Sequence, residues 1–186
     1  MILDIVSTKK ALIRQILDIE EKWFTEVKAS EESSCRENLS AFRNTRKIGF
    51  MPMSRRTLKA YLEHVKYAKT RGRNLMIEKY ARMDNLIPPL KESFFIDKIV
   101  DIQKEWLADL KKRYPYIFKE NPTDNFANYL RSELETYSDK TLENYYSDIK
   151  KALAKGVNLV EQSYMYLAKT NGFSSLEDMN SHLANK

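Results

Sequence analysis

Two ionisable side chains interrupt stripes of apolar residues that have the spacing of a helix face. Glu20 lies in the stripe that begins at Ile13, and Arg46 lies in the stripe that includes Phe42. A charge that faces a protein core is costly unless it is paired or held by several hydrogen bonds. We therefore predict that Glu20 and Arg46 meet in the interior. The pair is either an internal ion pair without chemistry, or an acid or base beside a guanidinium that binds an anionic substrate.

A second group of charged residues follows in the same half of the sequence. Arg73 precedes an expected helix, whose amino end favours anions. Glu78 and Arg82 are four residues apart, so they can pair on one helix face. With Lys79, these residues form either a solvated helix surface or a cluster that binds an anion.

Three further residues complete the set of candidates. Cys35 is either an inert thiol or, near a helix amino end that lowers its pKa, a weak candidate nucleophile without an evident histidine partner. Trp23 and Tyr61 are expected in the core, although aromatic residues also line pockets. One cysteine and two widely separated histidines fit no metal-ligand spacing, so we expect no metal, and the sequence indicates no cofactor.

The sequence contains an internal repeat that organises these candidates. With an offset of 84, SRRTLKAYLEHVKYAKTRGRNL (54–75) aligns with SDKTLENYYSDIKKALAKGVNL (138–159) with nine identities, and an offset of 83 aligns the opening segments. A duplication is the best explanation. We predict an all-α fold made of two four-helix units, 1–86 and 92–186, packed into one compact body with a pseudo-twofold relation.

Periodic apolar residues and local signals define the expected helices. In the first half the helices run from about 8 to 28, from 36 to 48, from 54 to 72 and onward from Asn74. Those of the second half run from about 92 to 113, from 124 to 136, from 138 to 156 and onward from Asn158. Ser54 and Ser138 are expected N-caps, whereas Gly72 and Gly156 suit left-handed C-terminal caps.

The halves differ at the positions that carry inward charge. Gln103 aligns with Glu20, and Leu130 aligns with Arg46. Inward-facing charge is therefore predicted in the first half alone, and the second half is expected to play a supporting role.

Composition narrows the class of protein. The net charge is +6, and residues 43–82 hold twelve basic residues against two acids. This excess favours an anionic partner, although no nucleic-acid motif accompanies it. No apolar run approaches the roughly 18 residues of a membrane helix, and charges from Asp4 onward interrupt the amino terminus. We expect a cytoplasmic protein.

Three segments are similar to a bacterial family known as domain of unknown function 4125. They are GRNLMIEKYARM (72–83), the Ser34-Cys35 pair ahead of Phe42 and Arg46, and YLRSELETYSDKTL (129–142). The resemblance covers nearly the whole chain and implies a bacterial, anaerobe-associated protein, but it supplies no reaction. Members typically carry Met, Gln and Trp where this chain has Thr45, Gly49 and Met53. The resemblance therefore implies that a chemistry based on those three residues is absent here.

Our leading hypothesis is a helical enzyme or enzyme accessory that binds a small anionic ligand in a polar pocket of the first half. The pocket would be formed by Glu20, Arg46, Arg73, Glu78, Lys79 and Arg82. The alternative is a non-catalytic module that binds protein or nucleic acid with the basic surface of residues 43–82. A carboxylate-bridged metal centre is a third, weaker possibility, because the Glu-x-x-His pairs of such bundles are missing.

Overall fold

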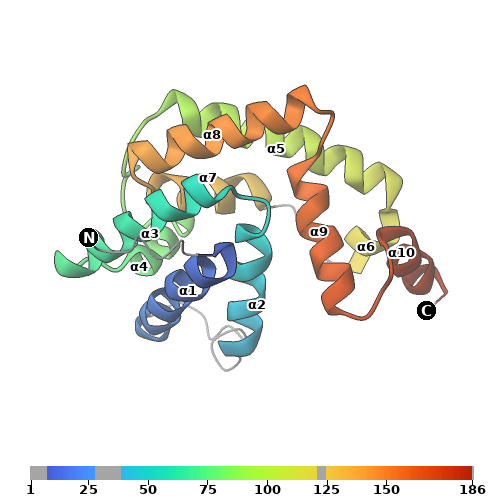
Figure 1. The fold of residues 1–186 in the computed structure, drawn as a ribbon, viewed down its shortest axis with the longest axis horizontal. Coiled ribbons are helices and arrows are strands. Elements are labelled where there is room, and N and C mark those ends of the chain that lie inside the picture. The colour runs from blue at the N-terminus through green and yellow to red at the C-terminus, as the bar shows by residue number, and fades with distance from the viewer. Residues whose placement is uncertain (1–7, 28–38, 121–124, 186) are drawn as a thin grey trace.

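Helices form all the regular secondary structure of residues 8–27, 39–120 and 125–185, which the computed structural model describes (Figure 1). In chain order the helices are α1 (Lys9–Glu26), α2 (Leu39–Phe50), α3 (Arg55–Thr70), α4 (Leu75–Met83), α5 (Phe94–Arg113), α6 (Pro115–Glu120), α7 (Phe126–Glu135), α8 (Asp139–Ala154), α9 (Leu159–Thr170) and α10 (Leu176–Ala184). The predicted all-α class is confirmed for this part of the chain. Cys35 lies outside the described residues.

Local capping determines where α3 and α8 begin and end. The hydroxyls of Ser54 and Ser138 each accept a hydrogen bond, at 3.2 Å, from the amide three residues later. At the other ends, Gly72 and Gly156 have φ values of 68° and 64°, a region that costs glycine little. These four predicted caps are confirmed.

Two asparagines fix α4 and α9 across the long helices α1 and α5. Asn74 and Asn158 cap the amino ends of α4 and α9. Their side-chain amides also donate to a tryptophan carbonyl, from Asn74 to Trp23 at 3.0 Å and from Asn158 to Trp106 at 3.1 Å. Trp23 itself is a core residue. Each cap thus also holds two helices together.

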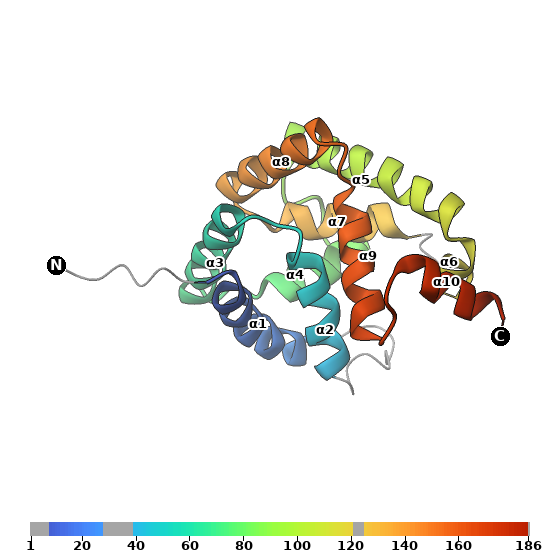
Figure 2. The ribbon, with the colours of Figure 1, turned by 45° about the vertical axis from the view of Figure 1, so that its right-hand side comes forward.

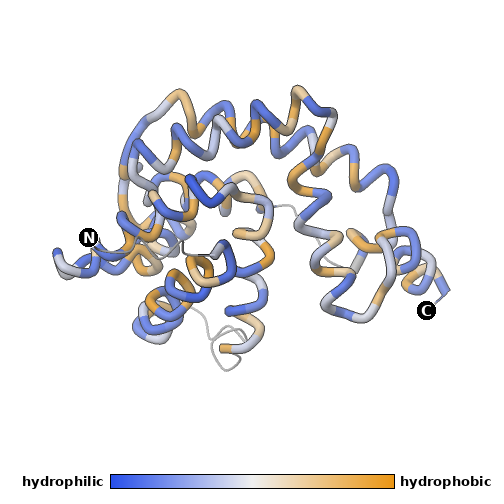
Figure 3. Tube along the Cα trace, in the orientation of Figure 1, coloured by the Kyte–Doolittle hydropathy of each residue, from blue (hydrophilic) through white to orange (hydrophobic). Residues whose placement is uncertain are grey.

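The helices pack in two similar groups that interlock (Figures 1 and 2). α1 contacts α2, α3 and α4, and α5 contacts α7, α8 and α9. Between the groups, α3 packs on α8, α2 on α9, and α4 on α7. The main hydrophobic core therefore contains residues from Leu12 to Leu159, drawn from both halves of the sequence. Apolar residues alternate with polar ones along most helices, as amphipathic packing requires (Figure 3).

A smaller core joins α5, α6, α9 and α10. The helix α6 was not expected from the sequence. Pro115 can begin this helix because the first helical residue needs no amide donor. Across the described ranges, no helix is long and apolar enough to cross a lipid bilayer.

Candidate functional site

Glu20 of α1 and Arg46 of α2 meet in the protein interior, where their side chains form a bidentate ion pair. Arg46 Nε and Nη2 donate to the two Glu20 oxygens at 2.8 and 2.7 Å. Glu20 is fully buried, and the exposed fraction of Arg46 is 7%. The Tyr61 hydroxyl donates to Glu20 at 2.6 Å. Three donors thus compensate a carboxylate that has lost all contact with solvent.

Glu133 of α7, which was not predicted from the sequence, extends this pair into a network. Arg46 Nη1 lies 2.7 Å from the Glu133 carboxylate, and Lys79 Nζ lies 2.6 Å from it. Tyr137 donates its hydroxyl to Glu133 at 3.0 Å, and the Tyr129 ring centroid lies 3.7 Å from Lys79 Nζ, a favourable cation–π contact. We call Glu20, Arg46, Tyr61, Lys79 and Glu133 the buried network. Its two acids balance its two bases.

The prediction that inward-facing charge occurs in the first half alone is wrong. Glu133 and Glu135, both in the second half, are 5% and 3% exposed. Arg46 has one partner, Glu20, in its own half and a second partner, Glu133, in the opposite half, and an alignment of the two halves does not indicate a contact between them. A signal was nevertheless present in the sequence. Glu133 shares the apolar face of α7 with Leu130 and Leu134, and the apolar Tyr137 follows directly after the helix; this is the same pattern that identified Glu20.

The network holds its groups in their charged or hydrogen-bonding forms. Burial alone would raise the pKa of Glu133, but Arg46 and Lys79 outweigh it and lower the pKa to about 2. Burial lowers the pKa of Lys79, and the attraction of Glu133 overcomes this and raises it. Burial and the nearby Glu20 raise the pKa of Tyr61. None of these three groups therefore changes its proton near neutral pH.

The remaining charged candidates do not join this network. Arg73 pairs with Glu78 at the surface, with Nε and Nη2 at 2.8 and 2.7 Å from the two carboxylate oxygens. Arg82 instead turns towards α7 and donates to Glu135 at 2.6 Å through Nε. The predicted Glu78–Arg82 pair is therefore wrong, because Arg82 lies on the buried side of α4, facing the acid that needs it. Each of these cations already has a carboxylate partner.

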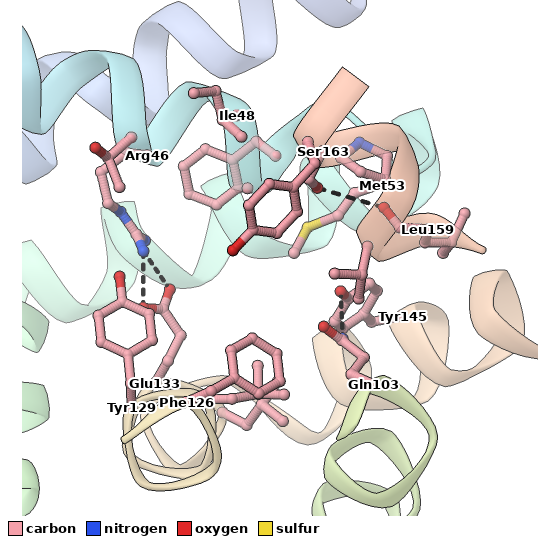
Figure 4. A pocket seen from close by; sticks show the side chains of 18 of the residues that line it. Arg46, Ile48, Met53, Gln103, Phe126, Tyr129, Glu133, Tyr145, Leu159 and Ser163 are labelled. Atoms are coloured by element: carbon pink, nitrogen blue, oxygen red, sulfur yellow. Dashed lines mark hydrogen bonds and ion pairs between the residues drawn. The ribbon is translucent and has the colours of Figure 1, made fainter. Parts of the chain in front are cut away.

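A cavity of about 340 Å³ lies beside the network, between α2, α7 and α9 (Figure 4). Its walls are mostly apolar and include Ile48, Phe50, Met53, Phe126, Leu130, Leu134, Leu159, Val160 and Leu167. Arg46 and Glu133 lie on one side, and Gln103 and Tyr145 lie on the opposite side. Thr45, Gly49 and Met53 all contribute to the lining.

Gln103 and Tyr145 form a neutral hydrogen-bonded pair at the cavity wall. Gln103 Nε2 donates to the Tyr145 oxygen at 2.8 Å, and each residue is 6% exposed. Burial raises the pKa of Tyr145, so its hydroxyl keeps its proton. Among the described residues, nothing accepts that proton or donates to the Gln103 carbonyl oxygen. The pair therefore offers one donor and one acceptor to a molecule in the cavity.

The sequence comparisons place the chain in a family without an assigned reaction. A family model described as "Protein of unknown function (DUF4125)" matches residues 10–181. Comparison with curated proteins and with solved structures gave no significant match. Within the described ranges, no three His, Cys, Asp or Glu side chains are grouped in a way that would hold a metal ion. The cavity is therefore the feature from which a function can be argued.

Proposed function

The chain belongs to the family of proteins of unknown function DUF4125, and because that family brings no reaction with it, we propose a function from the cavity. The cavity binds a small, uncharged and largely apolar molecule. This proposal keeps the small ligand expected from the sequence but moves it from the charged residues of the first half to the space beside them. We propose binding and assign no reaction, because the charged groups beside the cavity are already held by opposite charges.

The size and lining of the cavity carry this proposal. Protein interiors are close-packed, and voids much larger than a water molecule are few. A volume of about 340 Å³ falls at the lower end of the roughly 300–1,000 Å³ typical of small-molecule sites. Its apolar walls would gain from removing hydrocarbon from water. A ligand with a mainly hydrocarbon body therefore fits the site.

The charges beside the cavity favour an uncharged ligand. Arg46 already contacts Glu20 and Glu133, and Lys79 balances the second of these acids. An anion would add a negative charge next to Glu133, and it would lose its hydration without gaining an unpaired cation. The anionic ligand that the sequence suggested is therefore disfavoured at this site.

We also propose that 1–86 and 92–186 are duplicated units related by an approximate twofold exchange. Equivalent contacts support this, because the Tyr61–Glu20 bond at 2.6 Å has its counterpart in the Gln103–Tyr145 bond at 2.8 Å. The pairing of α2 with α9 likewise corresponds to that of α7 with α4.

The duplication offers a reason for the cavity. In the alignment, the buried-network residues Glu20, Arg46, Tyr61, Lys79 and Glu133 correspond to Gln103, Leu130, Tyr145, Ser163 and Gly49. All five of these counterparts line the cavity. Shorter side chains replace Arg46, Lys79 and Glu133, so the volume that the network fills in one half is left open in the other.

The alternative function, recognition of protein or nucleic acid by residues 43–82, has less support. Five basic residues of this stretch contact carboxylates: Arg43, Arg46, Arg73, Lys79 and Arg82. Their charge is largely neutralised within the protein. Binding of generic nucleic acid that weakens steeply with salt would favour this alternative.

Two substitutions of Gly49 test the cavity. A Cβ at Gly49 would meet no atom within 4 Å, so Gly49→Ala should stabilise the protein by up to about 1 kcal/mol through helix propensity. Gly49→Leu should place its side chain in the cavity. NMR of the protein would measure the binding of butylbenzene. We expect the wild-type protein and Gly49→Ala to bind it with similar affinity, and Gly49→Leu to bind it at least tenfold more weakly. Absence of saturable binding to the wild-type protein, or equal binding to all three, would contradict the proposal.

A further inference from the structure

We propose that the ligand of the cavity carries a neutral amide group, which binds the paired side chains of Gln103 and Tyr145. This inference rests on the proposed function and names the chemical class of its ligand. The amide carbonyl would accept the Tyr145 proton, and its N–H would donate to the Gln103 carbonyl oxygen. With the existing bond from Gln103 Nε2 to the Tyr145 oxygen, these contacts close a ring of three hydrogen bonds.

The unpaired polar atoms of Gln103 and Tyr145 face the cavity, where a polar partner can reach them. Gln103 and Tyr145 are more than nine-tenths buried, and both line the cavity (Figure 4). Buried polar atoms in native proteins nearly always have hydrogen-bond partners. The pair is uncharged and presents a donor and an acceptor on neighbouring atoms, and it would do so with either orientation of the Gln103 amide. An amide offers the complementary arrangement.

The counterpart pair shows what is missing. The Tyr61 hydroxyl donates to Glu20, and Arg46 donates to Glu20 twice, so both oxygens of this carboxylate have partners. At the position equivalent to Arg46 the chain has Leu130, which cannot donate a hydrogen bond. The ligand would therefore take the place of a side chain that the second half lacks.

The same features exclude a carboxylate as the preferred group. A carboxylate has no proton to donate to the Gln103 oxygen and would face that oxygen with a negative charge. On the opposite wall, Glu133 would repel it while Arg46 is already paired. Between the two walls, Met53, Phe126 and Leu159 line the space that would hold the apolar part of the ligand (Figure 4).

Three probes with one carbon skeleton test this inference. We would titrate the full-length protein with 4-phenylbutanamide, 4-phenylbutanoate and butylbenzene by calorimetry or NMR. The amide is expected to bind at least tenfold more tightly than the carboxylate. Tyr145→Phe and the near-isosteric Gln103→Met should each weaken amide binding about tenfold while leaving butylbenzene binding unchanged. Tyr146→Phe, which alters the neighbouring tyrosine of α8 outside the cavity lining, is the matched control and should leave both affinities unchanged.

The possible results distinguish a failure of the amide preference from a failure of the cavity as a ligand site. If no probe binds the wild-type protein, the proposed function fails. If butylbenzene binds but the amide gains nothing from Tyr145 and Gln103, the cavity is a ligand site and the amide inference is overturned. Tighter binding of the carboxylate, or loss of amide binding in Tyr146→Phe alone, would also overturn it. Thermal unfolding of each variant, followed by circular dichroism, verifies that the variant is folded. If Tyr145→Phe does not fold, Gln103→Met alone tests the hydrogen bonds to the amide.

Discussion

Arg46→Leu is expected to lower the free energy of unfolding by about 3–5 kcal/mol, the usual cost of removing one partner from a buried ion pair. The change would strand Glu20 without its two guanidinium bonds and leave Glu133 with Lys79 as its one cationic partner. Urea unfolding at pH 7, followed by circular dichroism, measures the loss.

Two companion variants show whether the buried network causes this loss. Arg43→Leu removes an arginine of the same helix that pairs with Asp18 and Glu21 but is 34% exposed, so we expect it to cost below about 1 kcal/mol. Arg46→Leu combined with Glu20→Gln introduces the residue types that the second half has at the equivalent positions, Leu130 and Gln103. This double variant should recover much of the lost stability. A single variant as mild as Arg43→Leu, or a double variant no more stable than Arg46→Leu, would show that the pairing does not stabilise the fold.

Glu133 is expected to produce a marked loss of stability in acid. Its pKa is lowered from 4.5 to about 2 in the folded protein, so its ionised form stabilises the fold fully above pH 4.5. This contribution is lost as the pH falls from 4.5 through 2, and the difference between the two pKa values corresponds to about 3 kcal/mol. Urea unfolding of the wild-type protein and Glu133→Gln between pH 6 and 2.5 tests this, because the gap between them should shrink below pH 4.5.

Glu78→Gln is the control for this experiment. Glu78 also pairs with an arginine, but its partner Arg73 is 44% exposed, and we expect a gap from the wild-type protein below about 1 kcal/mol at every pH. If the gap for Glu133→Gln stays constant with pH, the carboxylate does not titrate differently in the folded and unfolded protein, and the account of its environment is wrong.

Local signals in the sequence predicted much of the helical structure. Ser54 and Gly72 act on backbone groups within a few residues of themselves, so the ends of α3 could be inferred without knowledge of the fold. Glu20 and Arg46 could be paired because each interrupts an apolar stripe, and a buried charge requires an opposite charge. These inferences required only the spacing of apolar residues along a helix and the energetic cost of burying an unpaired charge.

Features that depend on how the halves pack could not be predicted in the same way. Arg46 and Glu133 are 87 residues apart in the sequence. Their contact depends on the packing of α4 on α7, with α2 beside them, and this packing lets the Arg46 guanidinium pair with both Glu20 and Glu133. The cavity is harder still, because it results from volume that Gly49, Leu130 and Ser163 fail to fill. Unfilled volume has no sequence motif. The predicted site was therefore placed on the charged residues of the first half.

The sharing of Glu133 between Arg46 and Lys79 has a consequence for synthesis on the ribosome. Helices α1 to α4 leave the exit tunnel before α7 has been translated, and at that stage the nascent chain holds three inward-facing cations, Arg46, Lys79 and Arg82, and a single buried acid, Glu20. The amino-terminal segment consequently cannot complete its interior by itself, although domains generally fold from the amino terminus during translation. Its final packing waits until α7, which carries Glu133 and Glu135, has left the exit tunnel.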